Sequence, residues 1–124
     1  MPLKDRTILV VEDNPLIALD IAMMLEDEGA LVLGPCASVD EALALIDENA
    51  EKRQIHAAVL DFDLRIGTSV RVAHLLQEMA IPFVFYTGMD PAKASALKRL
   101  DAPVIPKPSP SAFLIASLVA QLQN

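Results

Sequence analysis

The sequence predicts an α/β fold in which five parallel strands form a doubly wound sheet together with five helices. Two features of the chain support this prediction. Five short apolar runs alternate with five stretches whose apolar residues recur at helical spacing, which is the pattern of repeated strand–helix units. Three of these runs, 7–11, 57–60 and 81–86, are apolar without alternation, so they should be buried on both faces at the centre of the sheet.

The bulk composition favours one folded domain spanning residues 1–124, a length that suits a single core. With 53% hydrophobic and 22% charged residues, the chain does not belong to the disordered class. The net charge of −7 argues against nucleic acid or an anionic membrane as a partner. A single cysteine, no visible signal peptide and no apolar stretch of membrane-spanning length lead us to expect a cytoplasmic protein.

The first strand–helix unit begins with the apolar run Thr7–Val11. Asn14 then offers a capping side chain, and Pro15 suits the first position of a helix. Gly29 is expected to lie just beyond the C-cap and end this helix.

The second unit has a short predicted strand, 31–33, closed by Gly34-Pro35. Ser38 and Glu41 then form the S-x-x-E pattern of a capping box, which predicts the start of the second helix. A polar stretch, 48–54, is predicted to be the loop that follows it.

The third strand is predicted at 57–60 and the fourth at 81–86. Between them, the third helix carries apolar residues at i, i+3, i+4 and i+7, namely Val72, Leu75, Leu76 and Met79. Asp90-Pro91 is predicted to open a fourth helix with a thin apolar stripe. The fifth strand is predicted at 104–106, and Ser109-Pro110 should open the fifth helix.

The expected strand order depends on which of the predicted strands can lie at an edge of the sheet. The fifth strand contains proline and the second ends at Gly34-Pro35, and proline belongs on edge strands. Right-handed crossovers and buried central strands then give the order 2-1-3-4-5, the flavodoxin-like arrangement, with its switch point between strands one and three.

Reactive side chains follow four of the five strands. Glu12 and Asp13 follow the first, Asp61 the third, Thr87 the fourth and Lys107 the fifth. Ligands of open parallel sheets bind beyond the carboxyl ends of the strands, at the point where strand order reverses. The sequence therefore predicts that these five side chains meet at one rim.

Clustered carboxylates at such a rim point to a divalent metal. Mutual repulsion is relieved by a hard cation with oxygen ligands, which favours Mg²⁺, with Mn²⁺ as an alternative. The expected ligands are Glu12, Asp13 and Asp61, and Asp63 is a further candidate through a backbone carbonyl. A metal-bound carboxylate can also act as a nucleophile and form an aspartyl phosphate. The metal and the ammonium of Lys107 would then neutralise the phosphoryl oxygens, and Thr87 would supply a hydroxyl.

This set of residues resembles the site of receiver domains in two-component response regulators, and the resemblance covers nearly the whole chain. It implies that Asp61 accepts the phosphoryl group, that Glu12 and Asp13 bind Mg²⁺, that Thr87 is the switch hydroxyl and that Lys107 binds the phosphate. It also implies a cis peptide bond between Lys107 and the proline that follows it. The phosphodonor would be a sensor histidine kinase or a histidine phosphotransfer protein. Such a protein is a phosphoacceptor capable of autodephosphorylation, not a turnover enzyme.

The chain also departs from most receivers. Val104 stands where a switch Tyr or Phe is usual, and Arg65 replaces the usual proline after the phosphoacceptor. The stretch 82–89 is similar to the "FAT GUY" receivers of alphaproteobacteria, although Tyr86 replaces the Ala and Asp90 the final Tyr.

Without a switch aromatic, we expect the output to run through the loop after strand four and the fourth helix, over residues 87–100. A downstream protein would then dock on the face formed by the fourth helix, the fifth strand and the fifth helix. Phe113 and Val119 offer apolar contacts there.

Three other functions are compatible with parts of the pattern. Asp61 and Asp63 match the D-x-D pair of haloacid-dehalogenase-type phosphatases, although those enzymes place the pair after the first strand. A flavodoxin-like FMN binder would need a Ser/Thr/Gly-rich phosphate loop where Glu12 and Asp13 stand. A receiver-like module that only binds protein is kept open by Val104 and Asp63.

Overall fold

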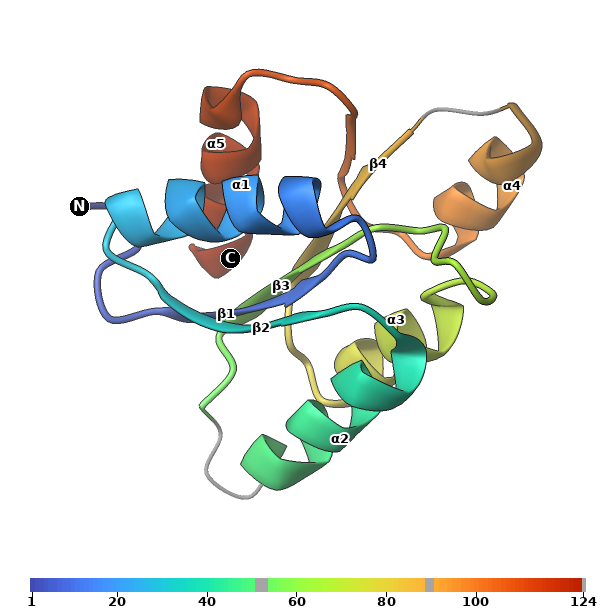
Figure 1. Cartoon of the computed structure of the whole chain (residues 1–124), viewed down its shortest axis with the longest axis horizontal. Helices are drawn as coiled ribbons and strands as arrows, with labels where there is room; N and C mark the ends of the chain where they lie inside the picture. The colour runs from blue at the N-terminus through green and yellow to red at the C-terminus, as the bar shows by residue number, and fades with distance from the viewer. Residues whose placement is uncertain (51–53, 89–90, 124) are drawn as a thin grey trace.

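The structure of the chain is a computed structural model that describes residues 1–50, 54–88 and 91–123, apart from the side chains of 91–94. Strands and helices alternate through these residues (Figure 1). They are β1 (Thr7–Val11), α1 (Pro15–Asp27), β2 (Leu31–Cys36), α2 (Val39–Ala50), β3 (Ala57–Leu60), α3 (Val70–Glu78), β4 (Phe83–Thr87), α4 (Pro91–Arg99), β5 (Val104–Pro106) and α5 (Ser111–Leu122).

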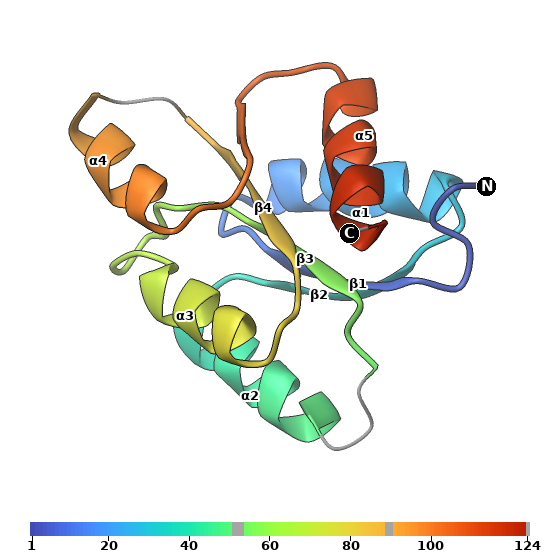
Figure 2. The ribbon, with the colours of Figure 1, turned by 180° about the vertical axis from the view of Figure 1, so that it is seen from behind.

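The five strands form one parallel sheet in the order β2-β1-β3-β4-β5, as predicted. Figures 1 and 2 show α1 and α5 on one face of the sheet and α2 and α3 on the other. The central strands β1, β3 and β4 are almost entirely buried, because helices cover them from both sides. No helix in the described parts of the chain is long and apolar enough to cross a membrane.

Successive strand residues alternate between two apolar layers. Ile8, Val10 and Val59 pack with Leu114 and Leu118 in the layer beneath α1 and α5. The opposite layer contains Leu9, Leu60 and Phe85, together with Leu76 from α3 and the two buried leucines of the α4 region, Leu97 and Leu100. The alternation places neighbouring residues of one strand, such as Phe85 and Tyr86, on opposite faces of the sheet.

The starts of α1 and α2 agree with their capping signals, whereas α5 begins at Ser111 with Pro110 as its N-cap and no side-chain cap. The side chain of Asn14 accepts hydrogen bonds from the backbone N–H groups of Leu16 and Ile17 at the start of α1. Ser38 Oγ accepts from the backbone N–H of Glu41, at 3.2 Å, at the start of α2. Gly29 follows the C-cap of α1 with a φ of +92°, a left-handed conformation that glycine adopts without strain.

One predicted strand end was wrong. β2 does not stop at residue 33 but continues through Gly34-Pro35 to Cys36. Gly34 has a φ of +96°, which allows the strand to bulge while Cys36 regains its pairing with Val11. Pro35 is tolerated because β2 is an edge strand, where a missing N–H breaks no necessary ladder bond.

The bounds of two further elements also differ. α2 extends to Ala50, past the predicted loop start at 48, and the side chain of Asn49 donates a 2.7 Å hydrogen bond to the carbonyl of Leu45. β4 begins at Phe83, not at 81, and includes Thr87. The N–H of residue 81 bonds back to α3, at the carbonyl of Leu76. The predicted opening of α4 by Asp90 lies outside the described residues.

Candidate functional site

The five predicted site residues come from adjacent strands at the carboxyl edge of the sheet. Glu12 and Asp13 follow β1, Asp61 follows β3, Thr87 is the last residue of β4 and Lys107 follows β5. β3 pairs with both β1 and β4, and β5 pairs with β4. The topology therefore brings all five to one rim, although up to 95 residues separate them in sequence.

Asp61 lies at the centre of this rim and is 7% exposed. Its Oδ1 accepts a 2.7 Å hydrogen bond from Thr87 Oγ1, and its Oδ2 accepts a 3.1 Å hydrogen bond from Lys107 Nζ. One carboxylate oxygen is thus held by a neutral hydroxyl and the other by an ammonium.

Glu12 is buried more deeply, with 2% of its surface exposed. Its Oε2 accepts a 3.1 Å hydrogen bond from the backbone N–H of Asn14, and its Oε1 accepts from Lys107 Nζ. Burial raises the pKa of Glu12, because desolvation disfavours the carboxylate, and the bond from Lys107 opposes that shift only in part.

The ammonium of Lys107 bridges two acidic side chains. Burial alone would lower the pKa of Lys107, but its hydrogen bonds to Glu12 and Asp61 outweigh burial, so the net shift is upward. The side chain therefore stays charged and offers a fixed positive group beside Asp61. The backbone N–H of Lys107 also donates to the carbonyl of Thr87 at 3.0 Å, which ties the two site residues together.

The chemistry of the acidic groups fits a divalent cation. One carboxylate oxygen from each of Glu12, Asp13 and Asp61 lies within 4.8 Å of the others. The ammonium of Lys107 bonds to two of these groups, Glu12 and Asp61, and balances one charge of three. A hard dication with oxygen ligands would balance the remainder, and the partial exposure of Asp13 leaves room for water ligands.

Asp63 is not one of these three grouped carboxylates. Its residue is exposed and forms an isolated antiparallel bridge with Thr68. The loop is closed by a 3.1 Å hydrogen bond from the N–H of Leu64 to the carbonyl of Gly67, which has a φ of +75°. The ligand role predicted for Asp63 concerns its backbone carbonyl and stays a prediction.

Two residues that contact the site were not identified from the sequence. Asn14 was predicted only as a helix cap, yet its backbone N–H also holds Glu12. Tyr86 was noted only as a departure from a motif, yet its ring centroid lies 5.8 Å from Lys107 Nζ. The position of Tyr86 could have indicated this contact. It is the penultimate residue of β4, so it lies close to the carboxyl edge of the sheet, on the face opposite to that of its neighbours in the strand.

The backbone beside the site contains the implied cis peptide bond between Lys107 and Pro108. A second cis peptide bond, between Gly34 and Pro35, lies in the edge strand β2 and was not expected.

Comparison with known proteins supports a receiver fold. No family model matches the chain. Among curated proteins, the phyllosphere-induced regulator PhyR of Methylorubrum extorquens is 34% identical over 83 residues, or 65% of this chain. The chain spans 30% of the length of that relative.

Solved receiver structures match over nearly the full length. A response regulator receiver protein from Sinorhizobium medicae is 26% identical, with a TM-score of 0.80 over 95% of this chain and 94% of that one. The non-phosphorylated HemR receiver domain from Leptospira biflexa is 24% identical, with a TM-score of 0.79 over 96% of this chain and 95% of that one. The fold is therefore that of the receiver domains of response regulators, a signalling module.

Proposed function

We propose that this chain is a phosphoacceptor receiver of a two-component system or phosphorelay, in which Asp61 takes a phosphoryl group with the help of Mg²⁺. The observation that carries the proposal is the arrangement around Asp61. Its carboxylate receives a hydroxyl from Thr87 and an ammonium from Lys107, and two further carboxylates lie within reach of the same small volume. If Lys107 and Asp61 formed an ion pair that served only stability, neither the hydroxyl of Thr87 nor the two further carboxylates would be needed beside it.

The transfer requires one new bond at Asp61. A carboxylate oxygen of Asp61 bonds to phosphorus as the phosphorus–nitrogen bond of a phosphohistidine breaks, and the electron pair of that bond stays on the imidazole nitrogen. Phosphoryl transfer depends on positioning and on neutralising the equatorial oxygens. Lys107 supplies a fixed cation for one of them, and Thr87 can move its hydroxyl hydrogen bond from Asp61 to another.

Glu12, Asp13 and Asp61, with the backbone carbonyl of Asp63, would hold the Mg²⁺ ion. When bound, the ion supplies positive charge for the attacking carboxylate and the phosphoryl oxygens. Asp13 is the most exposed of the three residues, so it is the one best placed to share the ion with water. Asn14 keeps Glu12 oriented toward this volume through its backbone N–H.

The phosphodonor would be a sensor histidine kinase or a histidine phosphotransfer protein, since the proposed chemistry takes a phosphoryl group from an imidazole. The downstream target would be a protein bound at the face of α4, β5 and α5. In α5, Phe113 is 60% exposed, and Val119 is half-buried against the layer that contains Leu114 and Leu118.

The rival phosphatase function needs Asp63 to act as a general acid beside Asp61. The described geometry does not favour it, because Asp63 is exposed in the loop and is not one of the three clustered carboxylates. An FMN binder is disfavoured too, because Glu12 and Asp13 occupy the turn where a flavin phosphate would sit and would repel it.

The decisive experiment is incubation with acetyl phosphate, with and without Mg²⁺, followed by intact mass measurement. We expect the mass to increase by one phosphoryl group only when Mg²⁺ is present. Asp61→Asn should abolish the increase. Labelling that persists in Asp61→Asn, or that is unaffected by a chelator, would contradict the assignment.

Asp63→Asn is a matched control, because it removes the same charge two residues along the loop and keeps the backbone carbonyl. We expect it to be labelled, with a changed rate of phosphate loss. If Asp63→Asn instead abolishes hydrolysis of p-nitrophenyl phosphate by an active wild-type protein, the phosphatase function is correct and the receiver function is wrong.

A further inference from the structure

Tyr86 places its aromatic ring beside the ammonium of the acceptor site. The centroid of the ring lies 5.8 Å from Lys107 Nζ, inside the distance of about 6 Å at which the face of an aromatic ring attracts a cation. The side chain of Lys107 is 17% exposed, and this attraction grows as the cation loses contact with water. The ring is therefore a third partner of an ammonium that also bonds to Glu12 and Asp61.

The register of the sheet accounts for this contact. Tyr86 pairs with Ile105 of β5, and both side chains belong to the layer beneath α1 and α5. Lys107 stands two residues after Ile105, which is one full repeat of a strand, and its N–H continues the ladder by donating to the carbonyl of Thr87. The side chains of Tyr86 and Lys107 therefore leave neighbouring strands on the same face of the sheet.

Packing alone does not require an aromatic residue at this position. Among the described residues of this layer, Tyr86 is the one aromatic, and its neighbours on the central strands are aliphatic, such as Val59 and Val84. The aromatic residues of the same strand, Phe83 and Phe85, belong to the opposite layer, where they contact each other edge to face. An aliphatic side chain in place of Tyr86 would fill this layer but would offer the ammonium no ring.

The backbone at Lys107 is fixed, whereas its side chain is a flexible methylene chain. On one side, the N–H of Lys107 donates to the carbonyl of Thr87, and on the other, Ser109 Oγ donates to the carbonyl of Pro106. These bonds determine where the side chain begins but not where its charge lies. The position of the charge depends on what the ammonium contacts.

The two anionic contacts of the ammonium change during the proposed reaction. Glu12 and Asp61 are both proposed ligands of Mg²⁺, and Asp61 is also the proposed acceptor, so neither keeps its whole charge for Lys107. The ring of Tyr86 is neutral and takes no part in that chemistry. It can hold the ammonium both before and after transfer, which keeps the cation in place for a phosphoryl oxygen.

We propose that Tyr86 is a positioning residue of the acceptor site, in which the face of its ring holds the ammonium of Lys107 beside Asp61. It acts through Lys107 and is not itself a reacting group. The contact between the two side chains stands by itself, whereas its effect on transfer rests on the proposed phosphorylation of Asp61. What the site needs from residue 86 is then the ring, and neither the hydroxyl nor the apolar volume.

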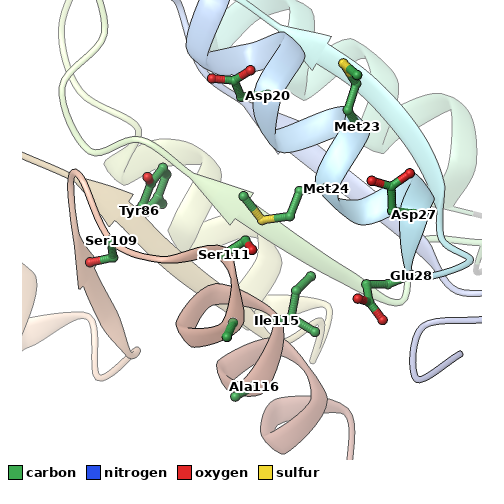
Figure 3. Close-up of a pocket in the computed structure, with 11 residues that line it drawn as sticks. Asp20, Met23, Met24, Asp27, Glu28, Tyr86, Ser109, Ser111, Ile115 and Ala116 are labelled. Carbon is green, nitrogen blue, oxygen red and sulfur yellow. The ribbon is translucent and has the colours of Figure 1, made fainter.

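Two substitutions separate the ring from the volume that it fills. Tyr86→Phe keeps the ring and removes the hydroxyl, while Tyr86→Leu keeps an apolar side chain and removes the ring. Tyr86 is half-buried and lines a cavity of about 720 Å³ between α1 and α5 (Figure 3), so water can enter the space vacated by the ring and the variant should fold. Ile115→Ala is the matched control, because it removes apolar contact from the same cavity and layer and leaves the ring in place.

The contact itself is tested by nuclear magnetic resonance on the metal-free full chain. An aromatic ring shifts the signals of nuclei near its face, so the ε-methylene signals of Lys107 should move toward those of an exposed lysine in Tyr86→Leu. They should stay in place in Tyr86→Phe and in Ile115→Ala. With beryllium fluoride and Mg²⁺, which mimic the phosphoryl group, the ring-induced shift should persist. Lys107 signals that are the same in Tyr86→Leu as in the wild type, or a shift lost when the mimic binds, would overturn the proposal.

The effect on transfer is tested with acetyl phosphate and Mg²⁺. The labelling rate, followed by intact mass, should fall about fivefold in Tyr86→Leu, which corresponds to a contact of about 1 kcal/mol. Tyr86→Phe should stay within about twofold of the wild type, since the face of the ring remains. Ile115→Ala should be less stable but labelled at the wild-type rate.

The other outcomes are equally clear. Equal losses of rate in Tyr86→Leu and Ile115→Ala would make Tyr86 a packing residue, and an equal loss in Tyr86→Phe would assign its role to the hydroxyl, so either result overturns the proposal. If the wild type takes up no phosphoryl group, the proposed function fails together with the effect of Tyr86 on transfer. The contact with Lys107 is then judged by the metal-free resonance measurement.

Discussion

Thr87 Oγ1 donates a 2.7 Å hydrogen bond to Asp61 Oδ1, and both groups are buried. The bond joins the ends of adjacent strands β4 and β3 and satisfies a carboxylate oxygen that would otherwise lie desolvated. It also means that the hydroxyl is already committed to Asp61 before any reactant arrives. Rearrangement of this bond is therefore the first local event that modification of Asp61 would cause.

Thr87→Val should destabilise the protein by about 1.5–3 kcal/mol, because it preserves the shape of the side chain and leaves a buried carboxylate oxygen without its donor. Thr87→Ser keeps the hydroxyl and should cost less. Urea denaturation of the three proteins measures the difference. A Thr87→Val variant as stable as the wild type would show that the hydrogen bond contributes nothing net to folding.

Asp13→Asn should weaken Mg²⁺ binding, because it removes a charged ligand from the three clustered carboxylates. It should also leave the metal-free protein unchanged or more stable, since it reduces repulsion within the group. Melting temperatures with and without Mg²⁺ provide both readouts. Asp63→Asn is the control and should keep the wild-type response, because it leaves its backbone carbonyl in place. A wild-type response in Asp13→Asn would exclude Asp13 as a ligand.

Cys36 gives a pH-dependent prediction. Burial, with a smaller contribution from the charge of Glu41, raises the pKa of its thiol from 9.0 to about 11. Because the folded pKa is raised, the unfolded chain loses this proton first. The contribution of the Cys36 thiol to the free energy of unfolding is therefore fully present below pH 9, and it is lost as the pH rises toward about 11.

Cys36→Ala isolates this contribution. The wild type should lose more stability than the variant between pH 9 and about 11, and the thiol should react slowly with iodoacetamide at pH 8. Parallel pH profiles of the two proteins, or rapid alkylation of the folded protein, would contradict the raised pKa.

Two serines should respond in opposite directions to the same substitution. Among the described residues, Ser69 Oγ is buried without a hydrogen-bond partner, so Ser69→Ala should stabilise the protein by about 1 kcal/mol. Ser38 Oγ caps α2 by accepting from Glu41, so Ser38→Ala should destabilise it by about 1 kcal/mol. Denaturant midpoints measure both. Destabilisation by Ser69→Ala would mean that its hydroxyl has a partner in solution.

The sequence was informative where one physical signal dominated. The third strand was predicted at its observed bounds, Ala57–Leu60, because four apolar residues stand between a polar loop and Asp61. The meeting of Asp61, Thr87 and Lys107 also followed, because strand order alone brings their positions together. These predictions needed only the spacing of apolar residues along the sequence and the topology of parallel sheets.

Predictions failed where a contact distant in sequence decided the outcome. β2 continues past Gly34-Pro35 because pairing of Cys36 with Val11 compensates for the interruption. The half-buried His56 is a second example, because its Nδ1 accepts a 2.9 Å hydrogen bond from the backbone N–H of Thr7, a contact that the sequence pattern does not indicate. No local spacing encodes a pairing across 49 residues.

The last prediction concerns α4 and the segment that leads into it, residues 87–100. Thr87 is bonded to Asp61, and Gly88 follows it with the wide conformational range of glycine. Among the described side chains near α4, Leu97 and Leu100 are the ones fully buried against the sheet. A helix whose described side chains contribute so few buried groups is an element that a change of charge at Asp61 can bias.

Amide hydrogen exchange with and without beryllium fluoride and Mg²⁺ tests this directly. We expect exchange across 87–100 to slow when the mimic is bound, because Thr87 gains a phosphoryl-like oxygen as a partner and pulls the following segment into one arrangement. α1 and α3 serve as internal references, since their inner faces are buried in the two apolar layers. Equal protection of α4 in both states, with changes confined to the loops that hold Glu12, Asp13 and Asp61, would show that the signal leaves the site by another route.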